Sequence, residues 1–403
     1  MKCLNTIIIA LSLLNINAFA QDLSKKSDIK FTMPQESTNK KGSEYKFTSV
    51  KNLDATPVQN QNMTGTCWSF SGLSFFESEL IRMGKGKDFN LAEMFVATKA
   101  YPLKADNFIR MHGRSNFGEG GGFPDVVNVI RKFGMVPEEI YSGKKDSKAP
   151  HNHGLFEATL NGIVKAAADD KNQKIDLEAV HATIEGACEA FMGKVPEKFE
   201  YKGKSYTPRS YADAMGINPD DYVFVTSFTH HPFYSKFVLE IPDNWNWDQM
   251  YNVPLADLKE IINYSLDNGY TIAWAADVSE KGFMFRDGLA IVPDKPFDKL
   301  SDDEKKSLAL KPQTQLIITQ ELRQKAFDNY ETQDDHGMHI VGSVKDQNGT
   351  VYYNVKNSWG NELNECDGYL YASESYVLYK TTSLMLYKKS IPPTIAKKLG
   401  LVQ

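Results

Sequence analysis

The sequence predicts an α+β protein with a helical half, a strand-rich half, and a large, partly helical insertion between them. In the segment 67–83, apolar residues recur at helical spacing, and a glycine cluster follows. An apolar stripe at the same spacing runs through 177–191, in the middle of the chain. In the segment 351–355, side chains alternate at the period of a half-buried strand. The helices therefore come first and the strands last.

Length and composition are those of an ordinary globular protein. The chain has 403 residues, of which 41% are hydrophobic and 24% are charged, so disordered and fibrous classes are excluded for most of it. The formal net charge is -5. Because a DNA-binding face needs a strong basic excess, this charge argues against nucleic acid as the main partner.

The first 20 residues have the pattern of a secretory signal peptide. Lys2 precedes an apolar run at 6–14, and residues 18–20 read Ala-Phe-Ala, the small residues after which signal peptidase cleaves. A buried N-terminal helix is the alternative, but a polar stretch follows at once. We expect an exported protein, periplasmic or secreted, with no membrane association once the signal is removed. Residues 21–45 hold few large apolar side chains and predict a flexible leader.

Residues 46–145 are expected to form the helical half. One helix begins at Cys67, after Thr66, which has the side chain of an N-cap, and ends before a glycine cluster. A second helix is expected between Pro124 and Gly134, because proline suits the first helical position and glycine the end.

The insertion is expected at 146–255, the strand-rich half at 256–390 and a C-terminal tail at 391–403. Cys188 belongs to the apolar stripe of the insertion and is interpreted as a small core residue. A strand is expected at 270–274.

A cysteine at the start of a helix has the position of a nucleophile. Cysteine attacks as a thiolate, and the positive end of a helix lowers the pKa of the thiol, as does a neighbouring imidazolium. Cys3 leaves with the signal peptide, so Cys67, Cys188 and Cys366 remain, an odd number that predicts at least one free thiol. Taken alone, Cys67 is more simply explained as a small buried residue.

Three separate segments favour a catalytic role for Cys67 over that of a small buried residue. Gln61 lies six residues before Cys67, in a run that also holds a turn glycine and a tryptophan after the cysteine. Far downstream, His336 begins the run His-Gly-Met-His-Ile-Val-Gly. The run Asn-Ser-Trp-Gly follows at 357–360. In this order, the segments resemble the active site of the papain-like cysteine peptidases.

The resemblance implies a papain-like fold and a role for each residue. Cys67 would be the nucleophile, His336 the general base and Asn357 the residue that orients the histidine. The side-chain amide of Gln61 and the backbone N–H of Cys67 would form the oxyanion hole. Trp359 would shield the histidine–asparagine hydrogen bond from water at the edge of the substrate site.

A glycine-rich run at 118–122 is not a phosphate loop, because the Lys-Ser/Thr pair that such a loop needs does not follow it. It is similar to the family's Gly-Gly-aromatic-Pro run, which lines the substrate cleft. The resemblance thus assigns Gly121 and Gly122 to substrate binding, where bare backbone pairs with an extended peptide.

No metal site or cofactor is predicted. His336 and His339 lie three apart on an expected strand, so their side chains should point to opposite faces. The pairs His151/His153 and His230/His231 lack nearby cysteines or a repeated carboxylate spacing, and are interpreted as surface or loop histidines.

Several further segments resemble the bleomycin hydrolase/aminopeptidase C branch of the family, namely 206–208, 251–255, 267–277 and 317–336. The resemblance covers about residues 46–390. It implies an aminopeptidase acting on peptide substrates, a homo-hexamer, and a C-terminus that lies in the active-site cleft.

Two alternatives to the aminopeptidase remain. A papain-like endopeptidase would result if the tail left the cleft open. A non-catalytic peptide-binding protein on the same frame belongs to another class. Inactive relatives usually lose one of the four residues Gln61, Cys67, His336 and Asn357, and this chain retains all four.

Overall fold

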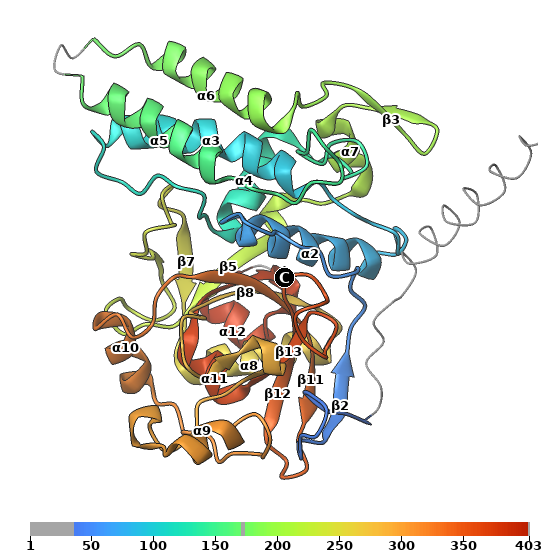
Figure 1. The fold of residues 1–403 in the computed structure, drawn as a ribbon, viewed down its shortest axis with the longest axis vertical. Coiled ribbons are helices and arrows are strands. Elements are labelled where there is room, and N and C mark those ends of the chain that lie inside the picture. Colours follow the sequence, from blue (N-terminus) through green and yellow to red (C-terminus); the bar gives the residue numbers. More distant parts are fainter. Residues whose placement is uncertain (1–35, 171–173, 402–403) are drawn as a thin grey trace, which may run out of the picture.

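The computed structural model describes residues 36–170 and 174–401. The expected signal peptide (1–20) and the expected leader up to residue 35 lie outside the described residues. Figure 1 shows a layer of helices above a strongly curved sheet, with helix α2 (Cys67–Arg82) between them. The helix that begins at Cys67 therefore lies at the boundary between the two halves.

Helix α2 is buried along most of its length. Every residue from Trp68 to Leu80 is buried, because α2 packs against strand β11 (His336–Lys345) as well as helices α3 (Glu93–Arg110) and α4 (Phe123–Phe133). This position between two layers explains why polar residues of the helix, such as Ser74 and Glu77, are buried as well as the apolar ones.

The expected second helix corresponds to α4, with nearly the expected bounds. Pro124 lies in its first turn, and Gly134 follows its last residue. Gly134 has a φ of 93°, a conformation that glycine adopts without steric cost.

The expected insertion is divided between the two halves. Helices α5 (Gly154–Ala168) and α6 (Leu177–Met192) pack against α3 and extend the helical layer. A small hairpin, β3 (Phe199–Tyr201) and β4 (Lys204–Tyr206), and helix α7 (Pro208–Met215) complete it. Cys188 is only 1% exposed in this core.

Strands β5 (Tyr222–Thr226), β6 (Lys236–Val238) and β7 (Gln249–Asn252) already belong to the main sheet. The boundary expected at residue 255 therefore does not match the sheet, which takes in the last part of the insertion. Sequence spacing did not reveal this because these strands are short and separated by loops.

The main sheet has 12 strands among the described residues and follows the order β6-β7-β5-β14-β8-β11-β12-β13-β10-β9, with β2 on β11 and β1 on β2. Its other strands are β1 (Glu36–Ser37), β2 (Phe47–Asn52), β8 (Ile272–Ala276), β9 (Phe283–Met284), β10 (Leu289–Ala290), β12 (Val351–Lys356), β13 (Tyr369–Ser373) and β14 (Thr381–Tyr387). The strand expected at 270–274 is β8, shifted by two residues.

Strand β12 was expected to be half-buried, but only Val351 is partly exposed. Both of its faces are covered. Tyr353 and Val355 belong to one core cluster, whereas the ring of Tyr352 packs against Phe47 of β2 at 5.1 Å between centroids. The alternation of side chains thus marks two buried faces, not one.

Figure 1 shows helices α8 (Leu255–Asp267), α11 (Glu374–Lys380) and α12 (Pro393–Lys398) inside the curve of the sheet. The remaining helices are α9 (Asp302–Ser307), α10 (Gln320–Asp328) and the short 3₁₀ turns Pro219–Asp221, Phe285–Asp287, Phe297–Lys299 and Lys388–Ser390. Ile395 and Leu399 of the tail are buried in the same core as α8. Over the described residues up to Leu401, the tail is therefore an integral part of the strand-rich half.

The expected leader is packed over its last ten residues, contrary to prediction. Strand β1 pairs with β2, and Tyr45 is fully buried. The side chain of Asn39 donates hydrogen bonds to the carbonyls of Asp287 (2.8 Å) and Ala309 (2.9 Å). Because these contacts come from residues far away in the chain, local composition did not reveal them. Among the described helices, none is long and apolar enough to span a membrane.

Candidate active site

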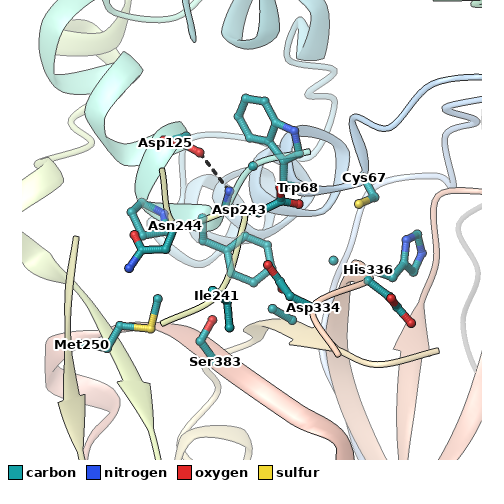
Figure 2. Close-up of a pocket in the computed structure, with 17 residues that line it drawn as sticks. Cys67, Trp68, Asp125, Ile241, Asp243, Asn244, Met250, Asp334, His336 and Ser383 are labelled. Atoms are coloured by element: carbon teal, nitrogen blue, oxygen red, sulfur yellow. Dashed lines mark hydrogen bonds between the residues drawn. The ribbon is translucent and has the colours of Figure 1, made fainter. Parts of the chain in front are cut away.

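Cys67 is the first residue of α2, at the end where the helix dipole is positive. Its thiol is partly exposed and lies close to His336 at the edge of a pocket (Figure 2). Thr66 does not cap the helix through its side chain, contrary to prediction. Its hydroxyl instead lies 2.6 Å from that of Thr64 and fixes the turn before the helix.

His336 and Asn357 come together because they lie at the facing ends of two paired strands. His336 begins β11, and Asn357 follows the last residue of β12. Their side chains are 2.7 Å apart, between His336 Nε2 and Asn357 Oδ1. The same Oδ1 accepts the N–H of Ser358 at 2.8 Å, which fixes it as an acceptor. His336 therefore donates from Nε2, and its Nδ1 is left for a reaction partner.

Trp359 covers this pair. The centroid of its ring lies 4.7 Å from that of His336 and 4.9 Å from that of Phe285, to which it is nearly perpendicular. His336 and Asn357 are only 6% and 3% exposed. The geometry is that of an imidazole held in one orientation and screened from water.

Gln61 lies on the other side of Asn357, against Ser358. Its Oε1 accepts the hydroxyl of Ser358 at 2.7 Å, and its Nε2 donates to the carbonyl of Thr64 at 2.7 Å. One N–H of the amide remains. Gln61 does not belong to the set of residues that line the pocket of Cys67.

Electrostatics favour uncharged side chains in the empty site. Burial raises the pKa of the Cys67 thiol to about 12, although the N–H of Gly337 works in the opposite direction. Burial also lowers the pKa of His336 to about 4, opposed by its hydrogen bond with Asn357. No hydrogen bond joins Cys67 to His336 in the described structure. Burial thus works against the charged form of both side chains, and transfer of a proton from Cys67 to His336 would create both charges together.

The pocket beside Cys67 opens to solvent, and about 510 Å³ of space, part of it open solvent, lies between its walls. It lies between the helical layer and the sheet, so distant segments contribute to it. Its lining residues are Cys67, Trp68, Gly121, Gly122, Phe123, Pro124, Asp125, Ile241, Asp243, Asn244, Met250, Ala275, Asp334, Asp335, His336, Gly337 and Ser383. Such a pocket, with a cysteine thiol at its edge, can hold part of a ligand next to that thiol.

Gly121 and Gly122 line this pocket, but their backbones differ. The N–H of Gly122 donates to Asp125 Oδ2 at 2.9 Å and is not free for a peptide. Gly121 makes no backbone hydrogen bond within the described chain. A Cβ on Gly121 would approach Asp125 and Trp68 to within 3.0 Å, so this position needs glycine.

Sequence reasoning missed the far wall of the pocket. Asp243 and Met250 come from the expected insertion, and Ser383 comes from β14. Asp334 immediately precedes the Asp-His pair and could have been noticed there. No local pattern links the other residues to Cys67, because only the pairing of the sheet brings them close.

The other histidines lie outside this pocket. His339 is 1% exposed and contacts Ser74 Oγ at 3.0 Å through Nδ1, on the face of β11 that packs against α2. His151 and His153 were interpreted as surface or loop histidines; they lie in a loop, but at 7% and 4% exposure they are buried. They pack beneath the turn that precedes α2, where the N–H of Met63 donates to the carbonyl of His151 and the N–H of His153 donates to the carbonyl of Met63.

His230 and His231 meet Glu240 with ligand atoms that all lie within 4.8 Å of one another. Gln324 donates to Nδ1 of His230 at 3.0 Å, because the Oε1 of the same amide accepts the N–H of Thr229. His230 therefore carries its proton on Nε2, where it bonds Glu240 at 3.0 Å. This arrangement is satisfied as a hydrogen-bonded cluster.

Comparison with known proteins gives a family for the whole chain. The model of the family described as "Peptidase C1-like family" matches residues 14–400. Aminopeptidase C of Lactococcus lactis subsp. lactis (strain IL1403) is 24% identical over 374 residues, covering 83% of this chain and 81% of the relative. Aminopeptidase G of Lactobacillus delbrueckii subsp. lactis is 22% identical over 388 residues, covering 84% and 82%.

Among solved structures, the crystal structure of PepW from Lactobacillus rhamnosis HN001 is similar to this chain with a TM-score of 0.68 and 20% identity. The match covers 96% of this chain and 92% of PepW. The family match and this likeness confirm the predicted papain-like α+β fold over nearly the whole length.

Proposed function

Because the chain belongs to the Peptidase C1-like family and is a cysteine-type peptidase, we propose that it removes residues from the amino terminus of peptides, with Cys67 as the nucleophile. The observation that carries the proposal is the 2.7 Å hydrogen bond between His336 Nε2 and Asn357 Oδ1 beside the pocket of Cys67. It leaves Nδ1 of the imidazole as the atom that takes the thiol proton.

The reaction begins when the Cys67 thiol gives its proton to His336 Nδ1. The thiolate then attacks the carbonyl carbon of the substrate, and the carbonyl oxygen becomes an oxyanion. The backbone N–H of Cys67, at the start of α2, and the remaining N–H of Gln61 are the donors for that oxyanion.

Collapse of the oxyanion breaks the carbon–nitrogen bond. The imidazolium of His336 gives its proton to the leaving amine, and a thioester remains on Cys67. A water molecule then loses a proton to His336 and attacks the thioester. Release of the acid and return of the proton to sulfur restore the neutral pair. Burial favours that neutral pair at rest, because it raises the pKa of Cys67 and lowers that of His336.

The amino-terminal specificity is supported by the relatives, which are named aminopeptidases C, G and W. The endopeptidase alternative requires an open cleft. None of the described tail residues up to Leu401 lines the pocket, and Val402 and Gln403 lie outside the described residues.

Two further proposals concern the whole protein. The pattern of the first 20 residues supports export to the periplasm or the medium. We expect mass spectrometry of the exported protein to show that its first residue is Gln21.

Resemblance to the aminopeptidase C branch supports a homo-hexamer. Analytical ultracentrifugation that finds only monomers would contradict it.

The proposed nucleophile is tested by Cys67→Ala. Under reducing conditions, this variant should lose all hydrolysis of aminoacyl fluorogenic amides and all labelling by iodoacetamide at the active site, because no other side chain is placed to form the thioester. Cys188→Ala is the matched control and should stay active, since Cys188 is buried in α6. Hydrolysis by purified Cys67→Ala would sink the proposal.

A further inference from the structure

The wall of the pocket opposite Cys67 carries two carboxylates whose role the reaction above does not explain. We propose that Asp243 and Asp334 form an ammonium-binding subsite that accepts the free α-amino group of the peptide substrate. This inference rests on the proposed aminopeptidase function and names the residues that would give it its selectivity. Figure 2 shows both carboxylates directed toward the same region, to one side of Cys67.

Four aspartates line the pocket, but two of them are committed to the protein. Asp125 accepts hydrogen bonds from the N–H of Gly122 (2.9 Å) and from the indole of Trp245 (3.0 Å). Asp335 accepts the backbone N–H of Ser279 at 3.0 Å. These carboxylates hold the walls of the pocket in place.

Asp243 is only partly committed. Its Oδ1 accepts the side-chain amide of Asn116 at 2.7 Å, and its Oδ2 lies against Gly120, where a Cβ would collide with it. The nearby ammonium group of Lys104 does not form an ion pair with Asp243. It donates instead to the carbonyls of Gly118 (2.7 Å) and Gly120.

Asp334 lies two residues before His336, next to Asp243 and Thr382, and the backbone N–H of Asp243 and the hydroxyl of Thr382 partly stabilise its carboxylate. Burial, Asp243 and Asp335 together raise the pKa of Asp334 to about 8, and burial likewise raises the pKa of Asp243. Within the described chain, neither Asp243 nor Asp334 forms an ion pair with a lysine, arginine or histidine. Two neighbouring carboxylates in this situation favour the entry of a cation, since it allows both to ionise.

A third polar group lies on the floor of the same pocket. Ser383 is 4% exposed, and its hydroxyl makes no hydrogen bond with any residue of the described ranges. Figure 2 shows the hydroxyl oxygen of Ser383 directed into the pocket, on the side of Ile241. A hydroxyl at the wall of the pocket can accept a hydrogen bond from an N–H group of a bound ligand.

The chemistry of these groups fits a primary ammonium better than a metal ion. An ammonium group carries one positive charge and three N–H donors, which match two carboxylates and a hydroxyl. A calcium ion takes six or more oxygen ligands. The pocket also contains Gly121 and Gly122, the run that the resemblance assigns to substrate binding, so we place the bound amino group on the acyl side of the bond that Cys67 attacks.

The test compares wild type with D243N, D334N and the double variant D243N/D334N. The substrates are a fluorogenic peptide amide with a free amino terminus, its N-acetyl form, and an N-acetyl form that carries a lysine. The expected result is a fall of roughly 10–100-fold for each single variant in the ratio of kcat/KM for the free-amine substrate to that for the N-acetyl one. In the double variant, the preference should disappear.

D220N is the matched control, because Asp220 is an exposed acid that pairs with Arg131 outside the pocket. Its ratio should equal that of wild type. Iodoacetamide labelling of Cys67 and the melting temperature show whether each variant is folded.

The possible outcomes separate the two proposals. A wild type without preference for the free amine overturns the aminopeptidase function, and the subsite with it. A wild type with that preference, unchanged in D243N/D334N, overturns the subsite alone. Loss of activity on the lysine substrate alone assigns the carboxylates to a side chain and overturns the α-amino proposal. If deletion of residues 402–403, and not D243N/D334N, abolishes the preference, the tail carries the selectivity and the subsite is likewise overturned.

Discussion

At the scale of single residues, the site depends on how one imidazole is held. Asn357 Oδ1 accepts from both His336 Nε2 and the N–H of Ser358, so the amide cannot rotate without losing two hydrogen bonds. Trp359 covers the ring of His336 from one side. The orientation of His336, the proposed base, is thus fixed by Asn357, to which we assign no proton transfer.

This division of roles predicts unequal effects of two substitutions. His336→Ala should lower kcat by roughly 10²–10⁴, the usual contribution of a general acid–base group. Asn357→Ala should lower kcat less, because the imidazole remains but is poorly oriented. Single-turnover measurements with a fluorogenic substrate check both values. Equal losses in the two variants contradict the roles assigned here.

The site could be predicted from sequence to the extent that its residues lie in short runs. Gln61, Cys67 and Trp359 each belong to a run with recognisable neighbours, and the structure brings His336 to Asn357. Asp243 stands in no such run, and only the pairing of distant strands places it opposite Cys67. Tertiary placement of that kind leaves no local signal.

At the scale of elements, a buried polar network connects α2 to β12. Lys356, the last residue of β12, donates to Thr56 Oγ1 (3.0 Å) and Ser74 Oγ (2.7 Å). Thr56 in turn donates to Glu77 of α2. Burial lowers the pKa of Lys356 to about 8 and raises that of Glu77. Since Lys356 directly precedes Asn357, this network holds the strand end that presents the asparagine.

The network predicts a non-additive pair of substitutions. Lys356→Met should reduce the free energy of unfolding by about 3–5 kcal/mol, because Glu77 loses the charge that faces it in the interior. The double variant Lys356→Met/Glu77→Leu should recover part of that loss, as apolar packing replaces the pair. Urea denaturation followed by circular dichroism measures both. If the loss of stability in the double variant equals the sum of the losses in Lys356→Met and Glu77→Leu, the two side chains are not coupled.

Element bounds were predictable where glycine and proline mark them. Helix α4 begins and ends where Pro124 and Gly134 indicate. The burial of β12 on both faces and the packing of residues 36–45 were not predictable. In both cases, the partner lies in a distant part of the chain, and a short segment does not encode which face a distant element will cover.

At the scale of the whole molecule, the two halves meet where α2 crosses β11. Cys67 comes from one half and His336 from the other, so their separation depends on how closely this helix and strand approach. Gly337 lies at the contact. A Cβ there would come within 2.6 Å of Ser71 Oγ and 3.3 Å of the Cα of Trp68.

Gly337→Ala should therefore push the halves apart at the active site. We expect a loss of about 1–3 kcal/mol in stability from overpacking and a clear fall in kcat. Gly162→Ala is the control, since no atom lies within 4 Å of the added methyl group and Gly162 lies in α5, which does not line the pocket of Cys67. Thermal melts and steady-state kinetics of both variants check this. A Gly337→Ala enzyme with full activity disproves the idea that this contact sets the separation.

The complete burial of α2 also has a consequence for the time at which the protein becomes active. From Trp68 to Leu80, every residue of the helix is buried. One of the elements that pack against it, β11, begins nearly 270 residues later in the chain. Strand β2 can pair early with β1, but its other neighbour, β11, is likewise made much later. Contacts of such high sequence separation form late, because loop closure must precede them. A nascent chain that ends before β11 therefore has Cys67 but not His336, and α2 is not yet covered by the sheet. We expect peptidase activity only after β11 has been synthesised.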